Sequence, residues 1–565
     1  MKSVTNSVLV CIFVAPQISN AAASPSSLSP SISENSKPQS SQVSVSKLAS
    51  LAAQAFLPQV EAYLSVYYQA LKSGQSAFKA LENINNKVPY LAQGLIAQAL
   101  YKKYESDILK LVFNRPIYKI EQPETTDFDY DTTGKYFLTV SNNVNTLRVW
   151  NTQDFWSSGK YMRIYSKTFD EILNPVTFGP DEKAYAWVGN HLMSIDIKTK
   201  TVSTFGQLAD GIKYDEVEFI FLNGLKLYAG TIDHNDIHHS VKIVNIGTGE
   251  TVKEIDYPDE AMQPSMLYYS INAQKFFIVQ SDNSIRIIDP KTLEEKIVPP
   301  IGEEYIYISV IEASETKLYI GDSIGNVIIW DIEKNKLIKK QLDGEGNPAT
   351  YIAIPKNTDS KLSLCVEEAP NIILYDFVSD KEFVLEGHQG AVNACEFTND
   401  GNYLASISSD GTIKLWSTSQ ESLINIEPSE HGILKMKPIT TITGHSPEFG
   451  KLKFQPQDPS TSFHIFTCGA AETIPTIRIW FLPTSTTFSF NEVIYLLALA
   501  KLLDKDFLKT FDNKKEYNNY IEGLRDPRLL KDFSLPERTN ILEFLKTQQA
   551  RKVAPAITLR SAEAP

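Results

Sequence analysis

The sequence predicts an all-β propeller with α-helical segments at its N- and C-terminal ends. Three observations predict this fold class. Units of alternating apolar strands and polar turns repeat from about residue 116 to residue 490. The third strand of each unit ends on an aromatic or aliphatic residue that is followed by a polar one in most units. The regions on both sides carry apolar residues at helical spacing instead of alternation.

The repeat is clearest at the last apolar position of the third strand. This position recurs eight times, at Trp150, Ile195, Val244, Ile288, Trp330, Tyr375, Trp416 and Trp480. Successive positions lie 41 to 49 residues apart, except for a last step of 64 that contains an insertion around residues 421–437. A four-stranded blade takes roughly 40 to 45 residues. The spacing therefore favours eight blades, with seven as the alternative.

One unit carries a fuller set of motifs. It contains Gly387-His388, Ser406, Asp410-Gly411 and Trp416. This unit resembles the WD40-repeat consensus, and the looser likeness in period and strand pattern covers about two thirds of the chain. The resemblance implies a bacterial protein with eukaryotic-like repeats. It also implies that His388, Ser406, Asp410 and Trp416 form a structural hydrogen-bonded network with no catalytic role.

Ring closure is predicted from the start of the repeat region. Residues 117–120 alternate apolar and polar just before the first complete unit. A propeller removes its open edge by pairing its two chain ends in one sheet. We therefore expect residues 117–120 to form the outer strand of the sheet that ends at Trp480.

The organisation outside the propeller follows from composition. Residues 1–23 resemble a secretory signal peptide cut after Ala23, and the Ser/Pro-rich residues 24–46 are predicted to be a disordered linker. Residues 47–115 are predicted to be helical, with breaks near Pro58, Gly74 and Pro89. After the propeller at 116–490, we expect a helical segment at 491–550, capped at Asn491, and a flexible tail at 551–565.

Net charge and hydropathy limit the classes of ligand that the chain is expected to bind. With 54 Lys and Arg against 67 Asp and Glu, the formal charge of −13 disfavours nucleic acid as a ligand. No apolar run reaches membrane-spanning length.

Acidic residues recur in the turns between second and third strands, which share one face of a propeller. The candidates for binding a basic peptide or protein surface are Asp282, Asp322, Glu367, Glu368 and Glu472.

Motifs for catalysis or metal binding are sparse. His234, His238 and His239 form a metal candidate, although a solvated polar loop is the favoured interpretation. Cys365, Cys395 and Cys468 lie in apolar strands, where a buried thiol is the ordinary role. We therefore expect no catalytic residues, metal or cofactor.

The favoured function is a non-enzymatic protein-interaction scaffold of unknown oligomeric state. One alternative is a secreted propeller enzyme with a metal or cofactor site. A second alternative is an intracellular F-box-like WD40 adaptor. The location is exported if the signal peptide is cleaved and cytoplasmic otherwise.

Overall fold

The computed structural model divides the chain into a helical unit, 1–111 with 483–565, and a strand unit, 112–482. It describes residues 45–112, 118–121, 127–131, 133–141, 145–152, 162–169, 173–178, 183–188, 191–207, 217–223, 226–235, 238–245, 250–257, 264–270, 273–300, 307–339, 347–429, 432–443, 450–454, 463–469, 476–483 and 488–550. The predicted signal peptide, most of the predicted linker and the predicted tail lie outside these residues and stay predictions.

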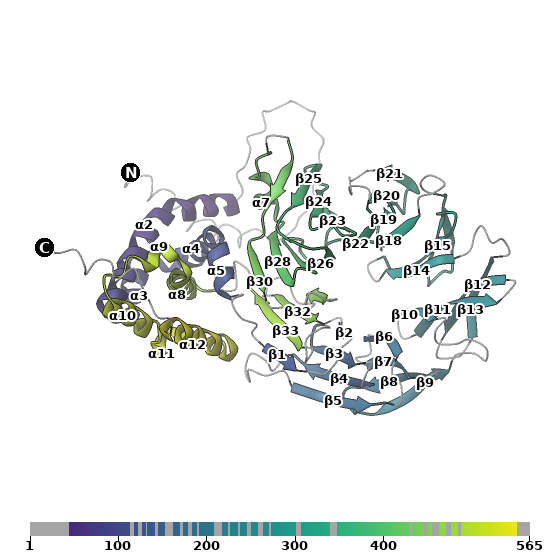
Figure 1. Ribbon diagram of the computed structural model, residues 1–565, viewed down its shortest axis with the longest axis horizontal. Coiled ribbons are helices and arrows are strands. Elements are labelled where there is room, and N and C mark those ends of the chain that lie inside the picture. Colours follow the sequence, from purple (N-terminus) through teal and green to yellow (C-terminus); the bar gives the residue numbers. More distant parts are fainter. Residues whose placement is uncertain are drawn as a thin grey trace, which may run out of the picture. The chain divides into compact units, whose positions relative to one another are not determined.

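The strand unit consists of eight consecutive antiparallel sheets (Figure 1). The first three sheets are formed by β2 (Asp127–Tyr130), β3 (Tyr136–Ser141), β4 (Thr146–Asn151) and β5 (Met162–Thr168); by β6 (Leu173–Phe178), β7 (Lys183–Val188), β8 (His191–Asp196) and β9 (Val202–Gln207); and by β10 (Val217–Asn223), β11 (Lys226–Asn235), β12 (His238–Asn245) and β13 (Glu250–Tyr257).

The next three sheets are formed by β14 (Pro264–Ser270), β15 (Lys275–Gln280), β16 (Ile285–Ile288) and β17 (Glu295–Val298); by β18 (Ile308–Ala313), β19 (Lys317–Asp322), β20 (Val327–Asp331) and β21 (Lys336–Lys339); and by β22 (Ala349–Ala353), β23 (Lys361–Val366), β24 (Ile372–Asp376) and β25 (Lys381–Leu385). The last two are formed by β26 (Val392–Phe397), β27 (Tyr403–Ser408), β28 (Thr412–Ser417) and β30 (Thr440–Thr443), and by β31 (Gly450–Phe454), β32 (Phe463–Gly469) and β33 (Thr476–Leu482) with β1 (Tyr118–Glu121).

The prediction of a mostly β propeller with flanking helices is confirmed. All eight repeat-end residues named above lie on the third strand of a sheet. The first strand of each sheet contacts the first strand of the next along the chain. The insertion at 421–437 supplies α7 (Gln420–Ile424) and β29 (Leu434–Met436), and β29 adds a parallel fifth strand beside β25.

The predicted closure strand is also confirmed. β1 pairs antiparallel with β33, with Tyr118 opposite Ile479 and Glu121 opposite Thr476. The sheet order is β1-β33-β32-β31, so the outermost strand of the last sheet comes from the start of the repeat region. This exchange replaces an open sheet edge with main-chain hydrogen bonds.

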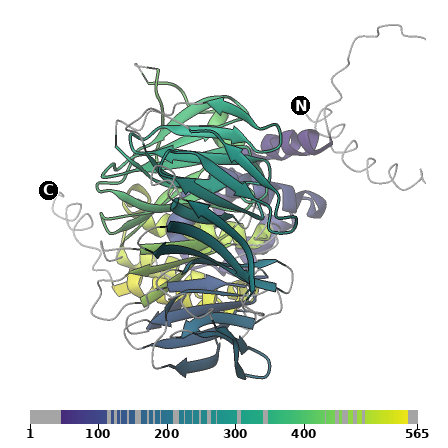
Figure 2. The ribbon, with the colours of Figure 1, turned by 90° about the vertical axis from the view of Figure 1, so that its right-hand side faces the viewer.

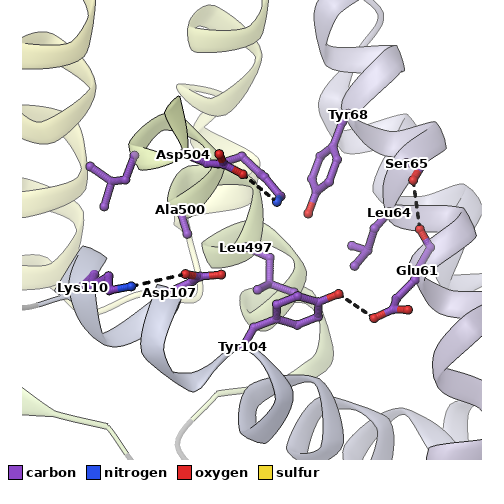
Figure 3. Close-up of a pocket in the computed structure, with 12 residues that line it drawn as sticks. Glu61, Leu64, Ser65, Tyr68, Tyr104, Asp107, Lys110, Leu497, Ala500 and Asp504 are labelled. Atoms are coloured by element: carbon purple, nitrogen blue, oxygen red, sulfur yellow. Dashed lines mark hydrogen bonds and ion pairs between the residues drawn. The ribbon is translucent and has the colours of Figure 1, made fainter. Parts of the chain in front are cut away.

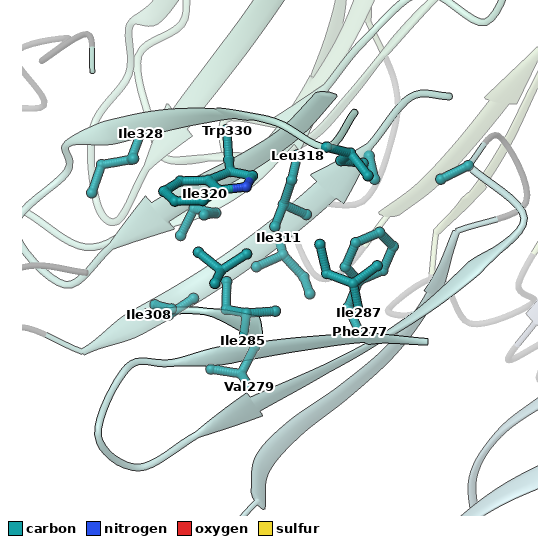
Figure 4. Packing of buried hydrophobic residues seen from close by; sticks show 14 residues of the cluster. Phe277, Val279, Ile285, Ile287, Ile308, Ile311, Leu318, Ile320, Ile328 and Trp330 are labelled. Carbon is teal, nitrogen blue, oxygen red and sulfur yellow. The ribbon is translucent and has the colours of Figure 1, made fainter. Parts of the chain in front are cut away.

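The core of the strand unit lies between neighbouring sheets. Middle strands such as β3, β23 and β27 are buried at every position because both of their faces pack on a neighbour. Figure 4 shows one such layer, where Phe277 and Ile287 from one sheet meet Leu318 and Trp330 from the next. The outer strand β5, by contrast, has no buried residue. The strands are seen from a second direction in Figure 2.

The helical unit combines helices from both ends of the chain. Its helices are α2 (Val45–Ser73), α3 (Ala77–Asn85), α4 (Tyr90–Lys103), α5 (Glu105–Val112), α8 (Phe490–Ala500), η3 (Lys501–Leu503), α9 (Lys505–Leu508), α10 (Lys514–Leu524), α11 (Pro527–Leu530) and α12 (Leu535–Ala550). α2 contacts α10, and α4 contacts α8. The Lys72 ammonium of α2 donates to the Thr510 carbonyl, which lies between α9 and α10, at 3.0 Å. None of the described helices is long and apolar enough to cross a membrane.

Two local helix predictions were wrong. α2 continues through Pro58, although proline inside a helix costs roughly 3 kcal/mol. α2 contacts α3, α4 and α10. α8 is capped by Ser489 and not by Asn491, because Ser489 and Glu492 form a capping box. The breaks predicted near Gly74 and Pro89 are present between α2, α3 and α4.

Candidate functional site

The four residues of the predicted network are brought together in the sheet of β26–β28. His388 Nε2 lies 2.8 Å from Ser406 Oγ, and His388 Nδ1 lies 3.0 Å from Asp410 Oδ2. The Trp416 indole N–H donates to Ser406 Oγ at 2.9 Å. The rings of His388 and Trp416 and the Ser406 side chain are buried, so these bonds are shielded from water.

The hydrogen bonds assign the protons of this network. Ser406 Oγ accepts from Trp416, so its own hydroxyl is free to donate to His388 Nε2. His388 Nδ1–H then donates to the Asp410 carboxylate, which leaves the imidazole neutral. Burial lowers the pKa of His388, and this outweighs the opposing effect of the hydrogen bond that His388 donates to Asp410. The network therefore ties the loop before β26 to β27, β28 and their turn.

Asp410 is a strong acceptor at the end of this network. Besides His388, it accepts from the backbone N–H of Gln389 at 2.9 Å and from both the N–H and the hydroxyl of Thr412. Burial acts to raise the pKa of Asp410, but these hydrogen bonds dominate and lower it to about 2.

These two shifts predict acid sensitivity. Both His388 and Asp410 have a pKa in the folded state below the unfolded value, so their contribution is full above the unfolded pKa and is lost as the pH falls. We expect the urea midpoint to decrease first below about pH 6.5, from His388, and again below about pH 4, from Asp410. The His388→Gln variant should lack the first decrease. An identical pH profile for the variant would contradict this assignment.

Other sheets keep only parts of the network. The Trp150 indole N–H donates to Thr139 Oγ1 at 3.1 Å, so Thr139 takes the place of Ser406. In the sheet of β18–β21, Ile320 occupies the corresponding register position. The buried Trp330 indole N–H consequently has no hydrogen-bond partner. Comparing Trp416 with Trp330 therefore measures how much the hydrogen bonds of the network contribute to stability.

The predicted acidic residues lie in the turns between second and third strands. We call residues 281–284, 322–326, 366–371 and 408–412 the turn rim. Two of the turns are bonded to the next sheet: Asn283 Oδ1 accepts from Ile308 N, and the Ala369 carbonyl accepts from Val392 N, both at 3.2 Å. The turns of residues 281–284 and 366–371 are thus held against their neighbouring sheets.

The predicted partner-binding residues differ in their exposure. Glu367 and Glu368 are exposed, and Asp282 is half-buried with its carboxylate accepting from Ser284. Asp322 is only 4% exposed, which disfavours direct contact with a partner. Its carboxylate accepts from Ile324 N, Asn326 N and Asn326 Nδ2 inside its own turn. Glu472 lies outside the described residues.

Exposed apolar side chains accompany the two glutamates. Tyr307 is 60% exposed and Ile324 is 41% exposed. Tyr307 belongs to this face because its backbone N–H and carbonyl both bond to Ser323 of the turn. An exposed tyrosine and isoleucine next to acidic turns match the mixed chemistry of protein-binding surfaces.

A second set of residues, most of them polar, occupies the first strands. In each sheet, one residue of the first strand is aligned, through the second strand, with the last apolar residue of the third strand. The first-strand residue just before it in the sequence belongs to this set. These residues, which we call the inner level, are Asp129, Thr177, Phe219, Tyr268, Glu312, Ala353, Glu396 and Lys453.

The described polar residues of the inner level connect neighbouring sheets. The Tyr268 hydroxyl donates to Glu312 at 2.8 Å, and Phe454 N donates to Glu396 at 2.8 Å. Lys453 donates to Asp129 at 2.6 Å, which joins the last sheet to the first. Burial raises the pKa of Glu312, although the Tyr268 hydrogen bond opposes it.

Sequence analysis did not find the inner level. In the sequence, an inner-level residue can be recognised as the residue just before the last apolar position of a first strand, as in Asp129-Tyr130 and Glu396-Phe397. The spacing alone could not show that these residues meet, because each comes from a different repeat.

The three histidines of the metal candidate lie at the end of the β11–β12 hairpin. His234 is opposite His239, and His238 is opposite Asn235, at the end of the β11–β12 pair. The side chains of these histidines lie outside the described part of the structure. Among the side chains that are described, no three His, Cys, Asp or Glu residues gather as metal ligands would.

The helical unit has a pocket of about 460 Å³ that no sequence pattern indicated (Figure 3). Tyr68 and Tyr104 line it beside Glu61, Asp107 and Asp504. The carboxylates have nearby cations: Lys103 for Glu61, Lys110 at 3.9 Å for Asp107 and Lys501 at 3.3 Å for Asp504. The hydrogen bond from Lys103, together with that from Tyr104, lowers the pKa of Glu61. The pocket lining is thus polar but locally charge-balanced.

Comparisons with known proteins agree with this organisation. A family model described as "WD domain, G-beta repeat" matches residues 379–417, which include β25 of one sheet and β26–β28 of the next. The transcription factor unc-37 of Caenorhabditis elegans is 28% identical over 129 residues, 22% of this chain and 21% of that protein. The serine-threonine kinase receptor-associated protein of Dictyostelium discoideum is 52% identical over 44 residues, 8% of this chain and 15% of that protein.

These matches span about a fifth or less of the curated relatives. Among solved structures, the computationally designed Ika8 protein aligns with a TM-score of 0.47 at 16% identity, over 65% of this chain and 100% of that one. The C-terminal WD40 domain of Sif2 aligns with a TM-score of 0.48 at 12% identity, over 65% and 97%.

Proposed function

Because this chain belongs to the WD40-repeat β-propeller family, we propose that it is a non-enzymatic scaffold whose turn rim binds a basic segment of a partner protein. The Dictyostelium discoideum relative is named for association with a serine-threonine kinase receptor, which supports a role in protein association. A propeller scaffold holds its turns rigidly, and function resides in those turns.

The observation that carries this proposal is the backbone of Glu368. Each of the four described turns of the rim contains one residue with positive φ, namely Asn283, Gly325, Gly411 and Glu368. Asparagine and glycine adopt this conformation readily, whereas glutamate pays about 1 kcal/mol or more for it. Glu368 has a φ of 58° and an exposed side chain, so the fold gains nothing evident from a carboxylate there. We infer that the carboxylate serves a ligand.

The chemistry of the ligand follows from the surface. Glu367 and Glu368 provide two adjacent exposed negative charges, and Tyr307 and Ile324 provide apolar area on the same face. A segment that carries lysine or arginine together with an apolar side chain complements both features. The overall charge of −13 adds long-range attraction for such a segment.

The experiment that tests this proposal separates binding from stability. Replacing Glu368 with asparagine, as found at Asn283, is expected to raise the free energy of unfolding by up to about 1 kcal/mol. The same variant should bind a lysine-rich peptide severalfold more weakly than the wild-type chain, measured by fluorescence anisotropy. Because the variant is more stable, weaker binding cannot result from unfolding.

A matched glutamate-rich peptide is the control for charge. Binding of the lysine-rich peptide should weaken as salt is added, since the Debye length falls to ~8 Å at physiological ionic strength. Equal affinity of the wild type and Glu368→Asn, with unchanged salt dependence, would refute the role of the turn rim.

We further propose that all eight sheets act as blades of one closed ring. The supporting observations are the contacts between successive first strands, the β1–β33 pairing and the Lys453–Asp129 ion pair between the last and first sheets. Class averages from electron microscopy should show eight radial features. A ring with fewer features would contradict this count.

A further inference from the structure

Two cysteines from neighbouring sheets meet in the core of the strand unit. Cys365 lies on β23, the second strand of its sheet, and Cys395 lies on β26, the first strand of the next. Their sulfur atoms are 3.2 Å apart. Both side chains are buried, and the Ser363 hydroxyl lies 3.3 Å from Cys395 Sγ.

This contact goes beyond ordinary thiol packing. A buried cysteine usually packs as a small apolar side chain, with no need for a second sulfur beside it. Here the two sulfurs face one another across the interface of two sheets, with about 1 Å of further approach needed to reach the disulfide bond length of ~2.04 Å. They are separated by 30 positions in the sequence, so the bond would close a loop that spans both sheets.

We propose that Cys365 and Cys395 form a disulfide between the two sheets when the chain folds in the presence of a small-molecule disulfide such as oxidised glutathione. One cysteine thiolate attacks oxidised glutathione and releases one reduced glutathione. The second cysteine thiolate then attacks the mixed disulfide and releases the other. The protein loses two protons and two electrons, and these reduce one oxidised glutathione to two reduced molecules.

The timing of the reaction follows from burial. The neighbouring Cys395 and the apolar surroundings both raise the pKa of the Cys365 thiol, so the thiolate is scarce in the folded chain. The bond therefore forms while the two sheets dock, before solvent is excluded. Once formed, it is protected from reductants by the same burial.

The consequence is a covalent link beneath the turn rim. Cys365 is two residues before Glu367, and Cys395 follows the Val392 N–H that bonds to the Ala369 carbonyl. The link would hold the turn of residues 366–371 against the next sheet and would restrict the unfolded chain. It does not depend on what the turn rim binds.

The test uses the full chain refolded from urea in a glutathione redox buffer. Remaining thiols are alkylated, and tryptic peptides are identified by mass spectrometry. Cleavage after Lys361, Lys381 and Lys414 places the two cysteines on separate peptides, residues 362–381 and 382–414. We expect these two peptides to be linked in most molecules, at least tenfold above any product that contains Cys468.

Cys468 is the matched control because it lies on β32 of the last sheet. Cys468→Ser should leave the linked peptides unchanged, whereas Cys395→Ser should abolish them. The oxidised wild-type chain should also have a higher urea midpoint than the reduced chain. A statistical mixture of cysteine pairs, or glutathione adducts with no Cys365–Cys395 link, would overturn the proposal without need of any variant.

Discussion

Replacing Trp416 with alanine is expected to lower the free energy of unfolding by about 4 kcal/mol. Trp416 is completely buried, and it is among the largest such side chains in the described part of the chain. The substitution removes its contacts with the β22–β25 and β26–β30 sheets and leaves Ser406 Oγ without its indole donor. The change is measured by urea denaturation followed by circular dichroism.

A second pair of variants isolates the hydrogen bond. Trp416→Phe and Trp330→Phe remove a similar part of the ring from the same strand position in two sheets. Only Trp416 loses a hydrogen bond, because the Trp330 N–H has no partner. Trp416→Phe should therefore cost about 1 kcal/mol more than Trp330→Phe. Equal costs would show that the His388 network contributes nothing through Trp416.

Reversing the charges of Glu367 and Glu368 together is expected to weaken binding of a lysine-rich segment roughly 10- to 100-fold. In the double variant Glu367→Lys with Glu368→Lys, each new lysine replaces attraction for the segment by repulsion at the exposed turn. The salt dependence should decrease or change sign, which is measured by repeating the titration at several ionic strengths.

The matched control is the double variant Glu315→Lys with Glu333→Lys. These residues are also exposed, but they lie in the turns between β18 and β19 and between β20 and β21, at the opposite ends of the strands from the turn rim. The control changes the net charge by the same amount. An equal loss of affinity in both double variants would indicate a general charge effect and would contradict a site at the turn rim.

Local sequence patterns were enough to predict the elements of the strand unit. Residues such as Trp150 and Trp480 lie near the ends of third strands because the alternation of apolar and polar residues encodes a strand locally. Residues 117–120 were predicted as the closure strand, since a strand with no partner in its own repeat must pair elsewhere, and the observed strand is 118–121. The network of His388, Ser406, Asp410 and Trp416 was predicted from the resemblance of one repeat to the WD40-repeat consensus.

The contacts between repeats could not be predicted from the sequence. The meeting of Cys365 with Cys395, the inner-level pair of Lys453 with Asp129 and the burial of Asp322 depend on side-chain geometry that the sequence does not display. α2 likewise continues through Pro58, where the sequence predicted a break. Local patterns fix the type and period of each element, whereas contacts between distant segments are selected by the packing of the whole fold.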